Sequence, residues 1–158
     1  MAGLPESAQG FQDRLNALGF SNIAVELPDS ARTAQAAADA LGCEPAHIAK
    51  SIIFRLTAAD KPLLVVASGV NRVNEMQIGS LLNDVLEKAD ADFVRGRTGY
   101  AIGGVPPVCH AEPILTLVDE DLFQYKTIWA AAGHPKTVFQ LTPDELVQMT
   151  GGQVVCVK

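Results

Sequence analysis

The stretch that most restricts the fold of this chain is Gly103-Gly104-Val105-Pro106-Pro107, in its second half. Glycine adopts main-chain conformations with positive φ and lets another group approach the backbone closely. Proline fixes φ and donates no hydrogen bond, so the two prolines stiffen the end of this stretch. The segment is therefore neither a regular helix nor a central strand. Two interpretations remain open: a tight surface turn, or a loop that presents main-chain groups in one fixed shape.

The composition is typical of a globular protein, and we expect residues 1–158 to form a single domain. Hydrophobic residues make up 48% and charged residues 19%, which distinguishes the chain from a disordered one. No apolar run approaches the roughly 20 residues that span a bilayer, and no signal-peptide pattern is present. We therefore expect no membrane partner and a cytoplasmic location. Cys43, Cys109 and Cys156 are too widely spaced to indicate a disulfide framework or a zinc site, so no metal is expected.

The net charge of −6 excludes a protein that coats DNA or RNA by bulk attraction. The acidic excess lies in the two ends of the sequence, whereas residues 46–110 are close to neutral. A local basic patch in this middle part remains open, and its alternative is an ordinary solvated face. The candidate members of the patch are Lys50, Arg55, Arg72, Arg95 and Arg97.

Hydrophobic periodicity predicts an α+β fold, in which helices and strands interleave around a mixed sheet. The strongest signal is a hairpin of two apolar runs, 51–56 and 62–67, at the centre of this sheet. Thr142-Pro143-Asp144-Glu145 begins a helix that ends at Gly151, with threonine as N-cap and proline at the first helical position. The other helices are expected at 7–18, 33–41, 74–82 and 90–97, and the other strands at 23–27, 114–118, 127–132, 137–141 and 153–157.

Few residues indicate chemistry by themselves. Lys50, between a helical turn and a core strand, is either a surface residue or a ligand for a phosphate or carbonyl at a cleft edge. Cys109 and His110 are neighbours on an extended segment and point to opposite faces, so they do not form a dyad, and Cys109 is expected to pack as a small apolar residue. His134 is a weak candidate for a substrate contact, and His47 is expected on a helix surface. Without a nucleophile elbow, a P-loop or a dinucleotide fingerprint, any hydrolysis would use water on an already activated bond.

Two segments together resemble the YbaK/ProX family of aminoacyl-tRNA deacylases, which also occurs as the editing insertion of bacterial prolyl-tRNA synthetases. The first is Gly42-Cys43-Glu44-Pro45-Ala46-His47-Ile48-Ala49-Lys50-Ser51-Ile52 with the hairpin after it, and the second is residues 98–107. The likeness extends from about Leu27 to the end of the sequence. It implies an α+β domain with a central bifurcated mixed sheet flanked by helices, which agrees with the periodicity.

The resemblance implies hydrolysis of the ester that links a wrong amino acid to the 3′ end of a tRNA. The essential lysine of the family falls on Lys50, and its glycine loop falls on Gly103 and Gly104. Attack by a bound water, assisted by the terminal ribose hydroxyl of the tRNA, fits the missing nucleophile, and no cofactor is implied. The expected partners are the tRNA acceptor end and a prolyl-tRNA synthetase. Substrate contacts are expected from Ser51, Ile102, Ala131, Gly133 and His134.

The chain departs from the branch of the family that removes cysteine. That branch has Ser-Gly-Gly-Lys where this chain has Ala131-Ala132-Gly133-His134, and its downstream aspartate falls on Val138. The pocket is therefore expected to be more apolar and to accept alanine or another small mimic of proline. Two other hypotheses stay open: a non-catalytic module that binds tRNA ends or amino acids, and a cysteine-dependent hydrolase, which requires an exposed and acidic Cys109.

Overall fold

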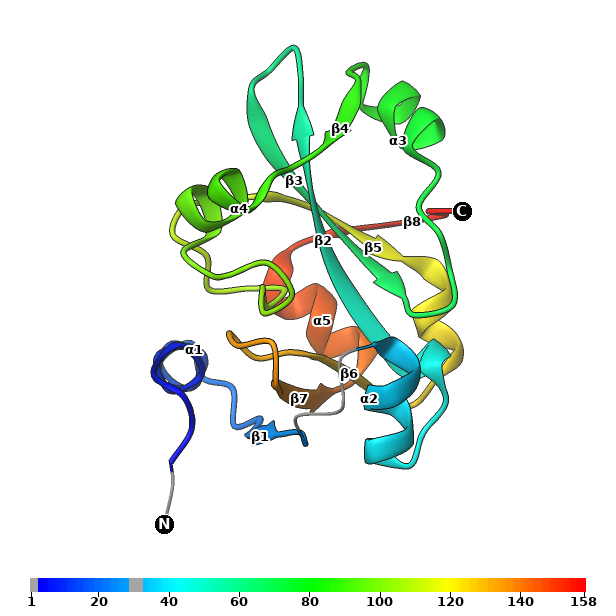
Figure 1. Cartoon of the computed structure of the whole chain (residues 1–158). Coiled ribbons are helices and arrows are strands. Elements are labelled where there is room, and N and C mark those ends of the chain that lie inside the picture. Colours follow the sequence, from blue (N-terminus) through cyan, green and yellow to red (C-terminus); the bar gives the residue numbers. More distant parts are fainter. Residues whose placement is uncertain (1–2, 29–32) are drawn as a thin grey trace.

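The structure is a computed structural model that describes residues 3–28 and 33–158. Its helices are α1 (Glu6–Ala17), α2 (Ala34–Leu41), α3 (Glu75–Leu82), α4 (Ala91–Thr98) and α5 (Pro143–Thr150), with two 3-10 helices, η1 (Pro45–His47) and η2 (Glu120–Gln124). Its strands are β1 (Ala24–Glu26), β2 (Ile48–Leu56), β3 (Lys61–Ser68), β4 (Leu86–Lys88), β5 (Leu115–Asp119), β6 (Ile128–Ala131), β7 (Thr137–Leu141) and β8 (Gln153–Val155). This arrangement, shown in Figure 1, confirms the predicted α+β fold.

The predicted hairpin, β2 and β3, lies at the centre of the sheet. The strand order is β1-β7-β6-β2-β3-β5-β8, and β4 joins β2 outside this path. Pairs of both directions occur, because β2 is antiparallel to β3 whereas β3 and β5 are parallel. The side chains of β3 from Pro62 to Ser68 are all buried, which explains why this strand is a continuous apolar run rather than an alternating one.

The sheet forks at the edge of β2 that faces away from β3. At its start, Ile48 and Ala49 pair with β6, and at its end, residues 54–56 pair with β4. The main chain of residues 50–53 has no strand partner on this edge among the described residues. The bifurcated sheet that the resemblance implied is thereby confirmed. In Figure 1 the fork lies where β2 passes from β6 below to β4 above.

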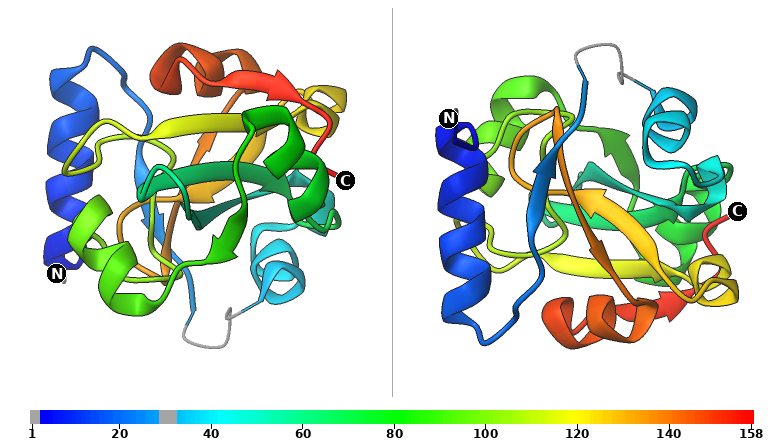
Figure 2. Two further views of the ribbon diagram at one scale, coloured as in Figure 1. Left: turned by 90° about the horizontal axis from the view of Figure 1, so that it is seen from above. Right: turned by 90° about the horizontal axis from the view of Figure 1, so that it is seen from below.

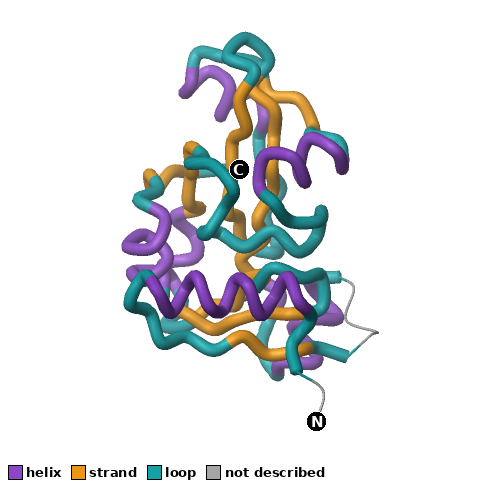
Figure 3. The backbone as a smooth tube through the Cα atoms, turned by 90° about the vertical axis from the view of Figure 1, so that its left-hand side faces the viewer, coloured by secondary structure: helices purple, strands orange, loops and turns teal. Residues whose placement is uncertain are grey.

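Two large apolar clusters fix the helices on the sheet. One contains Phe11 of α1, and the other contains Ile78 of α3. Helix α1 lies along one side of the molecule (Figures 2 and 3), and the ring centroids of Phe11 and Phe139 of β7 are 5.1 Å apart. No helix among the described residues is long and apolar enough to cross a bilayer.

The predicted boundaries differ from the structure by one or two residues at most elements, because end groups rather than periodicity decide them. Thr33, Asn74 and Asp90 are N-caps instead of first helical residues. The last strand ends at Val155, two residues earlier than expected. Strand β4 and helix η2 were not predicted, because three and five residues are too short to show a period.

Candidate active site

Two cavities adjoin one another at the fork, and the same short segment of β2 forms a wall of both. The cavity that extends toward β4 has a volume of about 580 Å³ and is here called the β4-side chamber. The cavity that extends toward β6 and α2 has a volume of about 330 Å³ and is called the β6-side chamber. Their common lining consists of Lys50, Ser51, Ile52, Gly103 and Val105. The fold thus brings together Lys50, Ser51 and Gly103, although Gly103 is distant from the other two in the sequence.

Lys50 is half-buried, and its ammonium group has a fixed acceptor. Its Nζ donates a hydrogen bond to the carbonyl oxygen of Asn71 at 3.1 Å. Asn71 is itself held, because its Nδ2 donates to Oδ2 of Asp119 and to Oδ2 of Asp121, both at 2.8 Å. Asp119 is only 1% exposed and also accepts a hydrogen bond from the Ser68 N–H. An ammonium carries three donors, so two remain available to a ligand in the chambers.

The hydroxyl of Ser51 is a second available group on the shared wall. Its Oγ is buried and has no hydrogen-bond partner within residues 3–28 and 33–158. Leaving a buried polar group unpaired costs on the order of 1–3 kcal/mol, so it is rare in native structures without a functional reason. Because Ser51 lines both chambers, a ligand there would supply the missing partner.

The glycine loop enters the fork as a tight turn. The Gly104 N–H donates to the carbonyl oxygen of Ala101 at 3.0 Å, and Gly103 has φ of +86°. This is the pattern of a type II turn, which requires positive φ at its third residue and hence glycine at 103. The Gly104 N–H is therefore already engaged within the turn and is not available to a ligand. The Gly103 N–H makes no hydrogen bond to any described residue, so of the two glycines it is Gly103 that keeps an available donor.

Gly104 is required for close packing rather than for a special φ. A Cβ at this position would lie 2.8 Å from the Cα of His134 and 2.9 Å from Cδ of Pro135. The glycine loop therefore contacts the loop between β6 and β7 directly. Pro106 and Pro107 are buried behind it, and Nε2 of His110 lies 2.7 Å from the carbonyl oxygen of Pro106. Since a carbonyl only accepts, the proton of a neutral His110 ring belongs on Nε2.

Cys109 does not meet the condition for a catalytic thiol. Burial raises the pKa of its thiol above the ordinary value, so the thiolate is disfavoured at neutral pH. The adjacent His110 is engaged with Pro106, and burial lowers the pKa of that imidazole. Cys109 lines neither chamber at the fork. These observations do not favour the cysteine-dependent hypothesis. Cys109 has φ of +69°, so the segment is not extended as the sequence predicted, but no hydrogen bond joins Cys109 to His110 among the described residues.

The other predicted substrate contacts fall in different places. Ile102 is 58% exposed and lines the β4-side chamber, and Ala131 lines the β6-side chamber. Gly133 packs against α1, where a Cβ would lie 2.7 Å from the carbonyl oxygen of Ser7. His134 lines a separate hollow beside α1, and its Nδ1 accepts a hydrogen bond from the Lys136 N–H. As substrate contacts, Gly133 and His134 stay predictions, and neither lines the two chambers that adjoin Lys50.

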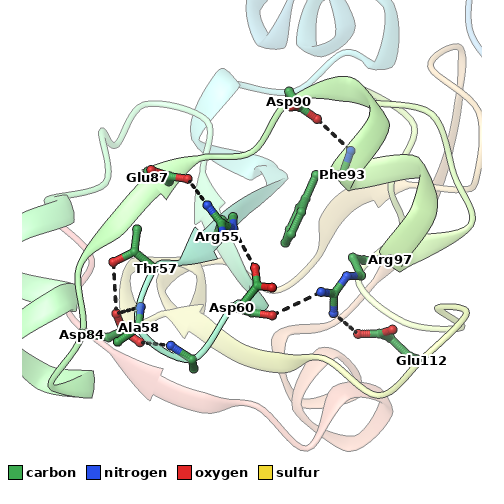
Figure 4. A network of polar contacts seen from close by, with 11 residues as sticks. Arg55, Thr57, Ala58, Asp60, Asp84, Glu87, Asp90, Phe93, Arg97 and Glu112 are labelled. Atoms are coloured by element: carbon green, nitrogen blue, oxygen red, sulfur yellow. Dashed lines mark hydrogen bonds and ion pairs between the residues drawn. The ribbon is translucent and has the colours of Figure 1, made fainter.

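The basic patch proposed for the middle of the sequence does not form as one surface. Arg55 pairs with Asp60 at 2.8 Å and with Glu87 at 2.7 Å, and Arg97 pairs with Glu112 at 3.2 Å. Figure 4 shows these residues around the tip of the hairpin, with Arg55 between the two acids. The guanidinium group of Arg55 holds the pKa of the Asp60 carboxyl below its usual range. Lys50 and Arg72 instead line the β4-side chamber.

Two residues of this site were missed from the sequence. Asn71 and Asp119 hold the carbonyl that binds Lys50, but they lie far apart along the chain and in no recognisable spacing.

His47 was expected on a helix surface, and its ring instead contacts that of Tyr125, with 4.2 Å between the centroids. Among the described residues, no group of three or more His, Cys, Asp or Glu side chains is placed to hold a metal ion.

The structure thus defines an α+β domain whose mixed sheet forks over a two-part cleft, with a lysine and a glycine turn on the shared wall. The family of aminoacyl-tRNA editing domains matches residues 28–149, and the chain belongs to this family. It is accordingly an aminoacyl-tRNA hydrolase of the editing type.

Individual relatives agree with this assignment. A crystal structure provisionally described as a trans-editing enzyme for prolyl-tRNA synthetase is 42% identical, with a TM-score of 0.94 and 99% of each chain covered. The uncharacterised protein YwhH of Bacillus subtilis (strain 168) is 29% identical over 133 residues, which are 84% of each chain. EbsC of Enterococcus faecalis (strain ATCC 700802 / V583), named provisionally as a Cys-tRNA(Pro)/Cys-tRNA(Cys) deacylase, is 26% identical over 124 residues, 77% of this chain and 74% of that protein.

Proposed function

We propose that this protein removes a small, wrongly attached amino acid, such as alanine, from tRNA(Pro). The observation that carries the proposal is the wall shared by the two chambers, because an ester placed there has room for a different group on each side. The aminoacyl group would occupy the smaller β6-side chamber, and the terminal nucleoside the larger β4-side chamber. The choice of tRNA is supported by two relatives, which are described provisionally as a trans-editing enzyme for prolyl-tRNA synthetase and as a deacylase of Cys-tRNA(Pro) and Cys-tRNA(Cys).

The lining of the β6-side chamber favours a small apolar side chain. Apart from Lys50 on the shared wall, its described lining holds no charged side chain. Each of the two threonines of this lining already makes one hydrogen bond: Thr33 accepts from the Ala36 N–H, and Thr137 donates to the His134 carbonyl. Away from Lys50 and Ser51 on the shared wall, a charged side chain would meet no group of opposite charge in the described lining, and burying it there would cost several kcal/mol. The remaining lining is mostly apolar and includes Leu27, Ala37, Ile48, Trp129, Ala131 and Val138.

The reaction would be hydrolysis of the ester by water. The water oxygen forms a bond to the carbonyl carbon, the bond from that carbon to the ribose oxygen breaks, and the ribose oxygen takes up a proton. Negative charge develops on the carbonyl oxygen, and a fixed main-chain N–H is suited to stabilise it. Of the two glycine N–H groups of the turn, that of Gly103 is available as such a donor among the described residues. An alternative role for the same turn is to hold the attacking water with a carbonyl oxygen.

Lys50 would bind the nucleotide side of the substrate. Its ammonium group lies on the shared wall and is fixed by the Asn71 carbonyl, so it can contact the terminal phosphate or the ribose with little loss of side-chain entropy. No carboxylate of the described residues forms an ion pair with it, so its charge is not already neutralised.

A panel of mischarged tRNAs tests the proposal. The purified protein should hydrolyse Ala-tRNA(Pro) faster than Pro-tRNA(Pro), and faster than tRNA(Pro) carrying a charged amino acid. Lys50→Ala serves as the matched inactive control. Equal rates for all esters would contradict the assigned specificity. A protein that binds these tRNAs and hydrolyses none of them would instead support the non-catalytic binding module. Addition of prolyl-tRNA synthetase to the same assay shows whether that enzyme is a partner.

A further inference from the structure

The β4-side chamber has basic residues on its rim that nothing neutralises within the described part of the chain. Its lining includes Arg72 and Lys88 in addition to Lys50, against one acid, Glu75. Neither the Arg72 nor the Lys88 side chain makes a hydrogen bond or an ion pair within residues 3–28 and 33–158. Lys88 and Arg72 are both exposed, so their charges remain available to a ligand.

The register of the sheet puts Lys50 and Lys88 on the same face. Side chains alternate along a strand, so Lys50, Ile52 and Phe54 of β2 share one face. Lys88 is directly opposite Phe54 in the antiparallel pair of β2 and β4, and directly opposite residues share a face. Four residues of a strand span about 13 Å. The two cations therefore mark the two ends of the chamber along β2.

Arg72 extends from a rigid base. The residue before it, Asn71, is held by the carboxylates of Asp119 and Asp121. The residue after it, Val73, is buried in an apolar cluster, and the Asn74 N–H donates to the Val157 carbonyl at 2.6 Å. A cation on a fixed main chain loses less conformational entropy when it binds than one on a mobile loop.

We propose that Arg72 and Lys88 bind backbone phosphates of the single-stranded 3′ end of tRNA as it leaves the β4-side chamber. This inference rests on the proposed function, because the acyl ester at the shared wall determines which end of the nucleic acid enters. Phosphate contacts position a nucleic acid without reading its sequence. They also fit a protein of net charge −6, because the attraction is confined to the rim of one chamber.

The test compares a full substrate with one that lacks phosphates. Arg72→Gln and Lys88→Gln should each lower kcat/KM on aminoacyl-tRNA by about fivefold, the value for an exposed charge contact of about 1 kcal/mol. Hydrolysis of the matching aminoacyl-adenosine, which has no phosphate, should be unchanged. Lys61→Gln is the matched control, because Lys61 is exposed and lies outside the chamber.

Binding of uncharged tRNA gives a readout that does not depend on turnover. For each phosphate that a variant no longer binds, the slope of log affinity against log salt should become shallower by about 0.7. If both variants keep the wild-type slope and kcat/KM, or lose activity equally on aminoacyl-adenosine, the inference is wrong. If the wild-type protein hydrolyses no ester while the variants still weaken tRNA binding, the proposed function fails and the phosphate contacts stand.

Discussion

Two groups of cations in this protein have opposite surroundings. At the tip of the hairpin, Arg55 and Arg97 each contact carboxylates within 3.2 Å, and Arg97 also donates to the Asp60 carbonyl at 3.1 Å (Figure 4). At the fork, Lys50 is bound by a neutral carbonyl, and Arg72 and Lys88 have no partner among the described residues. We refer to them as the hairpin group and the fork group.

The contrast separates cations that are already paired with carboxylates from cations available to a ligand. A charge that is already paired has little left to offer a substrate, and an exposed pair adds little to stability. A charge that lines a cavity without an acidic partner attracts an anion instead. Residue type does not distinguish the two groups, since each contains arginine. Only the position of acidic side chains on neighbouring elements does so.

The largest effect is expected at Lys50. Lys50→Ala removes the fork cation nearest the proposed ester, so most of the turnover should disappear, measured as single-turnover deacylation of the mischarged tRNA. The cost in unfolding free energy should be small, about 1 kcal/mol, because only one hydrogen bond is removed. Lys50→Arg should keep only part of the wild-type activity, because the planar guanidinium group of arginine replaces the compact ammonium group of lysine. A fully active Lys50→Ala protein would contradict the assignment of the fork group to substrate binding.

The next largest effect is expected at the glycine turn. Gly104→Ala forces the loop away from His134 and Pro135, and Gly103→Ala strains a residue with positive φ. Displacement of one donor to a developing oxyanion costs on the order of 3 kcal/mol, or roughly a hundredfold in rate. The measurement is kcat/KM together with tRNA affinity, which should change less. Gly96→Ala, in a helix with open space at its Cβ, is the control.

A smaller effect is expected at Asn71, which acts through Lys50. Asn71→Ala removes both hydrogen bonds that fix the carbonyl acceptor, and kcat/KM should fall by about tenfold, corresponding to about 1.4 kcal/mol. In a Lys50→Ala background the same substitution should cost almost nothing, because its target is gone. Additive losses in this double-mutant cycle would show that Asn71 supports the fold rather than the position of the ammonium group.

The smallest effect is expected from the hairpin group. Arg55→Gln should leave kcat/KM unchanged and lower Tm by no more than a few degrees, because the pairs are exposed. The pKa of Asp60 is lowered by its hydrogen bond to Arg55, so the stabilisation is present above the unfolded-state pKa. This stabilisation is lost as the pH falls through the folded-state pKa of Asp60, which lies below the ordinary value of 3.8. The Tm difference between wild type and variant should therefore disappear in acid, and a loss of activity at neutral pH would contradict the division into two groups.

Local sequence signals determined most of the elements. The hairpin was predicted because two apolar runs flank a short polar link, and α5 because Thr142, Pro143 and Glu145 form an N-terminal cap that the structure contains in full. The presence in one sequence of Lys50 before the hairpin and of the later glycine loop at Gly103 and Gly104 indicated the family. These features depend on residues close together in sequence, whose conformations are set by backbone sterics and local hydrogen bonds.

Tertiary structure alone decided what the site residues can do. The fork depends on β4, whose three residues form a strand only because β2 offers an edge to pair with. The Gly104 N–H makes a hydrogen bond, whereas the Gly103 N–H makes none to the described residues. The sequence, which shows only two adjacent glycines, does not predict this difference. The acceptor of Lys50 is fixed by a carboxylate 48 positions away from Asn71. Sequence determined which groups are present, and long-range packing determined which of them remain without partners, because pairing depends on contacts between distant segments.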